Sequence, residues 1–444
     1  SFLHVLSQGF NTGGHTRVVE RWIENAPNIE KHSVVVLKPN ENILSTLEKN
    51  VKDKNGDYIL FDNSLSMDGK ALKLRELGMH YQYIILHTHM EDPIATIAFG
   101  TEKFTRPVAL YNHASHMFWI GKSIADAVLD IVKNDETTIK KRAISNAMYL
   151  GVPSKVFSIK SFNKDSLKKE LNIPINKKII VSSGNPQKYV SICGNDFANI
   201  IKKLVNEETD CYVIGVDKRN KYWKRAYKES NKHIIPLGYI DFNNGYLKYL
   251  SAADLYIDSY PVGGGTALID AISSGTTSLS LKSNYPQFEY FVNTEAYCLT
   301  EEDFVQKARR ILNDAEYSKS ILDKLQSQLN EYQSIIAWQK RLKQIMPKIP
   351  SIHKVKDLSE ETDYHEIDDL SVLCNVLTNG RFQKKEKPHQ FSTKTGIEEY
   401  LKYGIQLKKK GISHIFEYII FEKNNKKVKV IKLFNITVLK IDKK

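Results

Sequence analysis

Short runs of apolar residues alternate with amphipathic stretches through the first third of the chain. The apolar runs are brief and are bounded by turn-forming or polar residues, which is typical of buried strands. They predict strands at residues 4–6, 33–37, 58–61, 83–86, 108–111, 128–132 and 148–150. Amphipathic segments such as 16–23 and 69–77 lie between these runs and predict helices. Because strands and helices alternate at this spacing, the pattern indicates a parallel sheet with helices on both faces.

The same pattern starts again after a basic polar stretch at residues 160–178. It predicts strands at 179–183, 211–215, 234–237, 255–258 and 277–281, and helices at 197–205, 246–252 and 266–273. The sequence therefore predicts an α/β protein with two doubly wound parallel-sheet domains. We expect the domains at 1–160 and 161–335, a helix at 336–350 that crosses back to the first domain, and a basic appendage at 351–444.

Charge and cysteine content narrow the range of functions. A net charge of +13 over 444 residues predicts an anionic partner, which is a phosphorylated substrate, a nucleic acid or an acidic membrane surface. The four cysteines are far apart, which fits a reducing compartment and argues against a disulfide framework or a zinc site. No run of about 18 apolar residues is present, so no transmembrane helix is expected. A cytoplasmic protein is the expectation.

A glycine-containing segment follows the first predicted strand. Gly13 and Gly14 let the backbone approach a ligand closely, and His15 opens a helix whose N-terminal N–H groups can receive an anion. Arg17, one turn further on, can add a charge-assisted hydrogen bond. The spacing is not G-x-G-x-x-G, so it does not indicate a dinucleotide site. The alternative is a tight turn that binds nothing.

Two more such segments follow strands of the second domain. The first carries Gln187 and Lys188, and Lys188 can neutralise a diphosphate or be an ordinary solvated lysine. The second begins where the strand at 255–258 ends, and it carries Gly263, Gly264, Gly265 and Thr266. Consecutive glycines expose N–H groups, and Thr266 can cap the helix with its hydroxyl facing a phosphate. Asp270, one helical turn further on, can accept ribose hydroxyls; the alternative is a flexible loop.

Four histidines follow two strands of the first domain, and they are His87, His89, His113 and His116. Loops after parallel strands meet at one edge of the sheet, so these side chains should gather near Gly13 and Gly14. Histidine transfers protons near neutral pH. Metal binding is the alternative, but the spacing without cysteines is weak support for it. No D-x-D pair on a loop is evident for a metal-bound nucleotide, so we expect no metal.

Taken together, these motifs resemble the GT-B class of glycosyltransferases across roughly residues 1–348. The resemblance rests on the Gly13-Gly14 loop, on Gly151-Val152-Pro153, on residues 237–239 and 249–254, and on the run from Tyr260 to Thr266. The last stretch is closest to the O-GlcNAc transferase group. The resemblance implies two Rossmann-like domains, the first facing the acceptor and the second binding a nucleotide sugar, with the active site in the cleft between them.

The resemblance also implies roles for individual residues. It places the donor on Gln187, Lys188, Tyr239, Tyr260, Gly263, Gly264, Gly265, Thr266 and Asp270. It places the acceptor near Gly13, Gly14, His15 and Arg17. It makes His113 the expected general base, with His89 and His116 as rivals and the carboxylates Glu91 and Asp92 as substitutes.

One departure from the class bears on stereochemistry. Retaining members carry two glutamates eight positions apart, whereas this chain has Val262 and Asp270 there. We therefore expect an inverting, metal-independent transfer, without a cofactor, from a UDP-linked sugar to a glycan or lipid-linked acceptor. The segments 112–121 and 432–441 also resemble bacterial surface-glycan transferases.

Other functions stay open at this point. A protein O- or N-glycosyltransferase and a sugar-nucleotide 2-epimerase share the two-domain plan. A basic membrane-binding or nucleic-acid-binding module is the alternative of another class, although no nucleic-acid motif is present and no nucleic-acid partner is expected.

The C-terminal segment has a charge pattern of its own. Residues 377–444 carry 17 Lys and Arg against 6 Asp and Glu, with aromatic residues interleaved. This pattern suits an anionic membrane surface, so peripheral attachment to the inner face of the membrane is one expectation. A small folded appendage with an aromatic core is the other.

Overall fold

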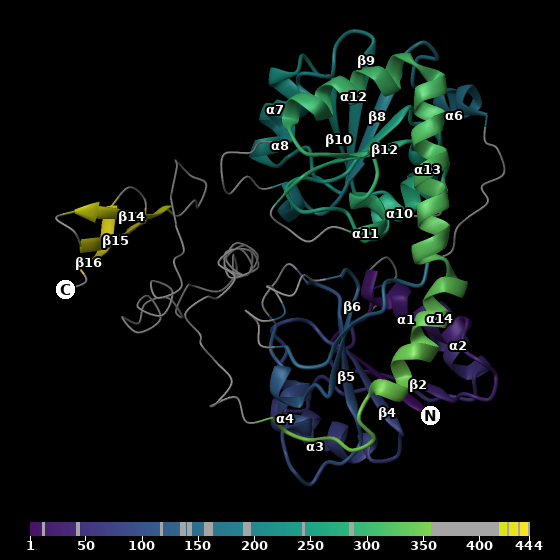
Figure 1. Ribbon diagram of the computed structural model, residues 1–444, viewed down its shortest axis with the longest axis vertical. Helices are drawn as coiled ribbons and strands as arrows, with labels where there is room; N and C mark the ends of the chain where they lie inside the picture. The colour runs from purple at the N-terminus through teal and green to yellow at the C-terminus, as the bar shows by residue number, and fades with distance from the viewer. Residues whose placement is uncertain are drawn as a thin grey trace. The chain divides into compact units, whose positions relative to one another are not determined.

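The computed structural model (Figure 1) describes residues 1–10, 14–40, 45–115, 119–133, 139, 144–154, 163–189, 197–241, 245–283, 288–356, 417–423, 426–433 and 436–442. Contacts divide the chain into two compact units. The first unit comprises residues 1–115, 120–134 and 145–356 and contains two parallel sheets. The second comprises residues 116–119, 135–144 and 357–444.

The first sheet has seven parallel strands in the order β3-β2-β1-β4-β5-β6-β7. The strands are β1 (Phe2–Leu6), β2 (His32–Val36), β3 (Tyr58–Leu60), β4 (Tyr83–His87), β5 (Val108–Asn112), β6 (Ala127–Asp130) and β7 (Ala147–Tyr149). The helices among them are α1 (Gly14–Glu24), α2 (Ser45–Asp53), α3 (Met67–Gly78) and α4 (Ile94–Phe99), with a 3-10 turn at Lys122–Ile124. All seven strands predicted from the apolar runs are confirmed.

The second sheet has six parallel strands in the order β10-β9-β8-β11-β12-β13. They are β8 (Lys178–Ser183), β9 (Thr209–Ile214), β10 (Ile234–Gly238), β11 (Leu255–Ile257), β12 (Ser278–Leu281) and β13 (Tyr297–Cys298). The helices are α6 (Lys164–Glu170), α7 (Phe197–Ile201), α8 (Lys221–Glu229), α9 (Leu247–Ala252), α10 (Thr266–Ser273), α11 (Glu289–Val292) and α12 (Glu301–Asn313), with a 3-10 turn at Pro186–Tyr189. The five predicted strands are confirmed. The sixth, β13, is too short to leave a periodic pattern.

Two consecutive helices, α13 (Ala315–Gln333) and α14 (Ile335–Ile345), carry the chain on to a 3-10 turn at Met346–Lys348 (Figure 1). Ser334 ends α13 and caps α14, its hydroxyl accepting the N–H of Ala337. The Trp338 ring of α14 packs edge to face on the Trp22 ring of α1, with the ring centroids 5.2 Å apart. The Gln339 amide donates to the carbonyl of Asn25. Residues of α14 therefore pack on α1 of the first sheet; the domain boundaries given above stay predictions.

The central strands of the first sheet are buried along their whole length. All five residues of β1, β2 and β5 are buried, as both faces of a parallel sheet covered by helices require. Three adjacent strands each carry a buried histidine: His32 on β2, His4 on β1 and His87 on β4. Ionisable side chains at such positions must be neutral or paired, because burial penalises charge.

Three antiparallel strands are described in the second unit, and they are β14 (Glu417–Lys423), β15 (Lys426–Leu433) and β16 (Ile436–Asp442). The described part of the C-terminal segment therefore forms an antiparallel sheet. Residues 377–416 lie outside the described residues, as do the side chains of the three strands, so membrane contact through 377–444 stays a prediction.

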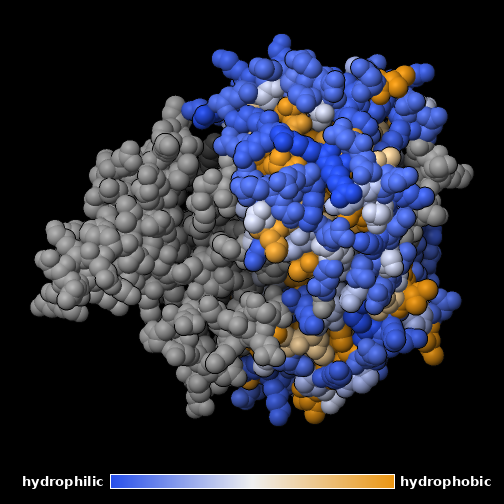
Figure 2. Space-filling model, turned by 45° about the horizontal axis from the view of Figure 1, so that its top comes forward, coloured by the Kyte–Doolittle hydropathy of each residue, from blue (hydrophilic) through white to orange (hydrophobic). Residues whose placement is uncertain are grey.

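Figure 2 shows a face of the molecule that is mainly hydrophilic, with hydrophobic side chains in scattered groups. Within the described ranges, no helix combines the length and the apolar character that crossing a bilayer needs.

Candidate active site

The first helices after β1 and β11 meet at their N-terminal ends. Arg17 of α1 donates to the Asp270 carboxylate of α10 at 3.4 Å, and the Asp270 side chain is almost fully buried. A methyl group added at Gly14 would lie 3.9 Å from the Thr266 hydroxyl. The two glycine-containing loops, one from each sheet, are therefore neighbours. Gly13 itself lies outside the described residues.

The loop after β11 is held by hydrogen bonds to its own ends. One Asp258 carboxylate oxygen accepts the N–H groups of Ser259 at 2.9 Å and Gly264 at 2.6 Å. The Lys188 ammonium donates to the carbonyl of Gly263 at 2.6 Å. These contacts hold the backbone of Gly263 and Gly264, directly before the start of α10.

The helix α10 begins with unused donors. Gly265, at φ +56°, is the N-cap, and Thr266 is the first helical residue. The predicted cap at Thr266 is therefore wrong: glycine takes the cap position because the chain turns there through a left-handed φ that β-branched residues avoid. In the part of the chain that the structure describes, the N–H groups of Gly265 and Thr266 have no hydrogen-bond partner. An anion with oxygen acceptors would satisfy both donors.

Burial shifts the titration of the groups around this loop. It raises the pKa of Asp258 to about 6, against the opposing effects of Lys188 and the two N–H donors. It lowers the pKa of Lys188, while nearby Asp258 raises it. The two side chains thus stabilise each other's charged forms in a place that disfavours an isolated charge.

The remaining predicted donor residues differ in position. Tyr239 is 67% exposed, whereas Tyr260 is buried. Gln187 lies in the turn Pro186–Tyr189, beside Lys188, and its side chain is outside the described residues. Asp270 was expected to face a ribose; in the structure its carboxylate is taken up by Arg17.

The histidines of the first sheet meet near the start of α1. The His15 ring stacks on the His113 ring, with centroids 4.1 Å apart and planes 22° from parallel. The His87 and His113 rings share a hydrogen bond of 2.9 Å between Nδ1 of His87 and Nε2 of His113. The His89 and His15 rings pack edge to face, with their centroids 5.9 Å apart. The predicted gathering of His87, His89 and His113 is therefore present, while His116 lies outside the described residues.

The imidazoles of His15, His87 and His113 are held neutral. Burial lowers the pKa of His113 well below its usual value, and the neighbouring His15, His87 and His89 lower it further. Burial, together with His89, lowers the pKa of His15 to about 4. A neutral imidazole has one free lone pair and can accept a proton.

Two further histidines join this group, and the sequence patterns did not single them out. His4 of β1 and His32 of β2 are fully buried and hydrogen-bonded to each other at 3.0 Å, and His4 also bonds His87 at 3.1 Å. The signal available in the sequence is one histidine inside an otherwise apolar strand. From the sequence alone, the residues of the adjacent strands that lie next to this histidine cannot be identified.

The two carboxylates named as substitutes for the base are placed differently. Asp92 is buried and accepts the Ser7 hydroxyl at 2.6 Å and the N–H of Ile94 at 3.2 Å, so it holds the start of α4. Glu91 is exposed.

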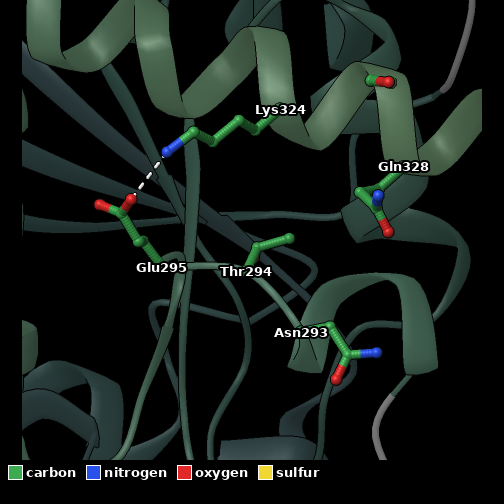
Figure 3. A pocket seen from close by; sticks show the side chains of 6 residues that line it. Asn293, Thr294, Glu295, Lys324 and Gln328 are labelled. Carbon is green, nitrogen blue, oxygen red and sulfur yellow. Dashed lines mark hydrogen bonds and ion pairs between the residues drawn. The ribbon is translucent and has the colours of Figure 1, made fainter.

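A surface pocket lies elsewhere in the second α/β domain, between the residues after α11 and helix α13 (Figure 3). It is lined by Asn293, Thr294, Glu295, Lys324, Ser327 and Gln328, and Lys324 pairs with Glu295 across it. None of the predicted site residues lines it. Among the described residues, no cluster of three or more His, Cys, Asp or Glu side chains is placed to hold a metal ion, and metal independence stays a prediction.

The architecture matches that of solved glycosyltransferases. A structure of HepE from Anabaena in complex with UDP shares 12% sequence identity at a TM-score of 0.58, with 78% of this chain and 100% of the other covered. An O-GlcNAc transferase mutant from Thermobaculum terrenum shares 11% identity at a TM-score of 0.57, covering 78% and 67%. WaaG, a glycosyltransferase of lipopolysaccharide biosynthesis, shares 14% identity at a TM-score of 0.52, covering 78% and 100%. This chain has the GT-B fold.

The resemblance stated from the motifs is thereby confirmed at the level of the fold. No protein-family model and no curated protein matches the sequence. At these identities the shared architecture does not carry substrate or mechanism with it.

The contact between Arg17 and Asp270 generates a prediction about stability. Replacing Arg17 with Met leaves the buried Asp270 carboxylate without its hydrogen-bonded partner, with only the more distant charge of Arg21 beside it. We expect the free energy of unfolding to fall by about 1–3 kcal/mol, measured by urea denaturation.

The matched variants are Asp270→Asn and the double variant. The double variant should be more stable than Arg17→Met alone, because the uncompensated charge is gone. Equal stability of the double variant and Arg17→Met would contradict the pairing.

Proposed function

We propose that the protein is a glycosyltransferase that moves a sugar from a nucleotide diphosphate, UDP in particular, to a hydroxyl of a glycan or lipid-linked acceptor. The supporting observation is the meeting of two chemically different groups at the α1 and α10 N-termini. One is an anion-binding loop with free N–H groups and Lys188. The other is a neutral imidazole, His113, at the end of β5.

The donor diphosphate is proposed to lie against Gly263–Thr266. The N–H groups of Gly265 and Thr266 point from the helix start, where the helix dipole also favours negative charge. Lys188 uses one N–H on the carbonyl of Gly263 and keeps two for phosphate oxygens. That HepE, with the same fold, was solved with UDP and with UDP-glucose supports UDP as the leaving group.

The chemistry proposed is a single displacement. His113 accepts the proton of the acceptor hydroxyl while that oxygen forms a bond to the anomeric carbon. The bond from this carbon to the diphosphate oxygen breaks, and the nucleotide diphosphate leaves with the electron pair. The N–H donors and Lys188 stabilise the charge that develops on it. One displacement inverts the anomeric centre, and no step of it needs a metal or another cofactor.

The donor half of the proposal predicts a loss of nucleotide affinity in Lys188→Ala. The variant removes one charged donor and also frees the carbonyl of Gly263. UDP binding measured by calorimetry should weaken by about 1.5–3 kcal/mol, the scale of a charged hydrogen bond.

The control is Lys178→Ala, which changes an exposed lysine at the opposite end of β8 by the same charge. Unchanged UDP affinity in Lys188→Ala would remove Lys188 from the site. Absence of binding of any nucleotide by the unaltered protein would contradict the proposed function.

The transfer half predicts the behaviour of His113→Ala. Release of nucleotide from the donor in the presence of acceptor should fall by about 10²–10⁴, while UDP affinity is kept, because the general base touches only the acceptor side. The exposed His80 supplies the control variant His80→Ala. Full turnover in His113→Ala would pass the role to another group.

The pH profile follows from the direction of the His113 shift. A base works in its unprotonated form, so kcat/KM is lost as the pH falls through its pKa. Since the pKa of His113 lies well below its usual 6.5, the acid limb should lie below pH 6.5 as well. An acid limb above pH 7 would contradict this assignment.

The class of acceptor can be identified with the same nucleotide-release assay. Glycan and lipid-linked acceptors should stimulate nucleotide release, whereas stimulation by polypeptides alone would indicate a protein glycosyltransferase. Epimerised donor formed without any acceptor would indicate a 2-epimerase.

A further inference from the structure

Five side chains form one continuous line of hydrogen bonds across the first sheet. The line runs from Glu30 to His32, His4, His87 and His113, with ring-nitrogen contacts between 2.9 and 3.1 Å. It begins at a partly exposed carboxylate just before β2 and ends at the proposed base just after β5. The three imidazoles between them are fully buried.

The register of the sheet produces this line. The strands β2, β1, β4 and β5 are adjacent, so neighbouring histidines lie on neighbouring strands. His32 is level with Phe2, two residues before His4, and His87 is level with Leu6, two residues after His4. Side chains two residues apart point to the same face of a strand. Each histidine along the line therefore lies on the same face of the sheet as the one before it, two residues nearer to the carboxyl edge.

The last step follows the same rule. Leu86 is level with Leu110, so His113 lies two positions beyond the level of His87. The line therefore crosses the sheet diagonally on one face, from the amino edge at Glu30 to the carboxyl edge at His113.

The atoms in contact alternate regularly. Nε2 of His32 faces the Glu30 carboxylate, and Nδ1 of His32 faces Nε2 of His4. Nδ1 of His4 faces Nε2 of His87, and Nδ1 of His87 faces Nε2 of His113. In every contact, therefore, Nε2 of one ring faces either Nδ1 of the ring nearer to Glu30 or, for His32, the Glu30 carboxylate itself.

Such a line has only two consistent proton arrangements. Burial lowers the pKa of His4, His32 and His87, so each ring is neutral and has one N–H and one lone pair. Either every ring carries its proton on Nε2, or every ring carries it on Nδ1. In the second arrangement the lone pair of His32 Nε2 would face the Glu30 carboxylate at 3.1 Å, which is repulsive.

An ionised carboxylate can only accept, so it selects the first arrangement. His32 donates to Glu30, His4 to His32, His87 to His4 and His113 to His87. Nε2 of His113 then holds the proton, and Nδ1 of His113 is left with its lone pair. Among the described residues, no hydrogen-bond partner of that Nδ1 is found.

We propose that Glu30, His32, His4 and His87 are positioning residues that fix the tautomer of His113, so that its Nδ1 is the proton-accepting atom. The link to catalysis rests on the proposed function; the tautomers themselves do not. A side chain at the opposite edge of the sheet thus sets the chemistry of the site through three buried rings.

The sharpest test breaks the line at His4, which does not touch His113. In His4→Leu, the buried N–H of His87 Nε2 loses its acceptor. The proton arrangement of His87 and His113 then inverts, because Nδ1 of His87 can donate to Nε2 of His113 instead. In His4→Asn, which has nearly the shape of Leu, the amide oxygen takes the place of the ring Nδ1 and still accepts from His87.

The first readout is the tautomer, observed by ¹⁵N NMR of the protein labelled in its histidine rings. The unaltered protein and His4→Asn should show His113 protonated on Nε2, and His4→Leu should show it protonated on Nδ1. Protonation of His113 on Nδ1 in the unaltered protein, or an unchanged tautomer in His4→Leu, overturns the proposal. If His4→Leu does not fold, His32→Leu makes the same test one ring further away.

The second readout is turnover, as nucleotide release with donor and acceptor. We expect kcat to fall by about 10²–10⁴ in His4→Leu and to be largely kept in His4→Asn, with UDP affinity equal in both. Equal turnover in the two variants overturns the role of the line in catalysis. Inverted tautomers with full turnover would instead show that His113 is not the base, and would count against the proposed mechanism alone.

Discussion

Parallel strands all end at the same edge of their sheet, and the candidate site depends on that constraint. In the first sheet it brings together residues at or just beyond the ends of β1, β4 and β5, so that His15 stacks on His113 and His87 bonds to His113. In the second sheet it places Lys188, after β8, on the glycine loop after β11. The two edges then meet through Arg17 and Asp270. Arg17 and Asp270 are 253 positions apart in the sequence.

Burial imposes a second condition on these polar groups, and the two sheets satisfy it differently. The charges of the second sheet are paired: Lys188 lies near Asp258 of the same sheet, and Asp270 is paired with Arg17 of the first sheet's α1. The first sheet keeps its buried imidazoles uncharged and joins them to one another. Paired charges suit the binding of another charged group, whereas a line of neutral, hydrogen-bonded rings suits the positioning of a proton.

Sequence reasoning succeeded where the signal is local. The apolar runs located the twelve predicted strands, and the breakers after two of them located the loops at Gly14 and at Gly263–Gly265. It failed where one residue's role depends on its neighbour. Thr266 is not the cap, because the backbone at Gly265 takes the left-handed turn. The partner of Asp270, an arginine of the other sheet, was likewise not evident from the local sequence, and the expected contact of Asp270 with a ribose stays a prediction.

The sequence by itself determined two parallel α/β sheets with glycine loops and histidines at their edges, because periodicity and turn chemistry are properties of neighbouring residues in the chain. The tertiary structure alone decided that His32, His4, His87 and His113 form one line. That line requires the strand order β2-β1-β4-β5 and a register that advances two residues at each strand. Strand order and register are fixed by packing between segments far apart in sequence, and no local pattern encodes them.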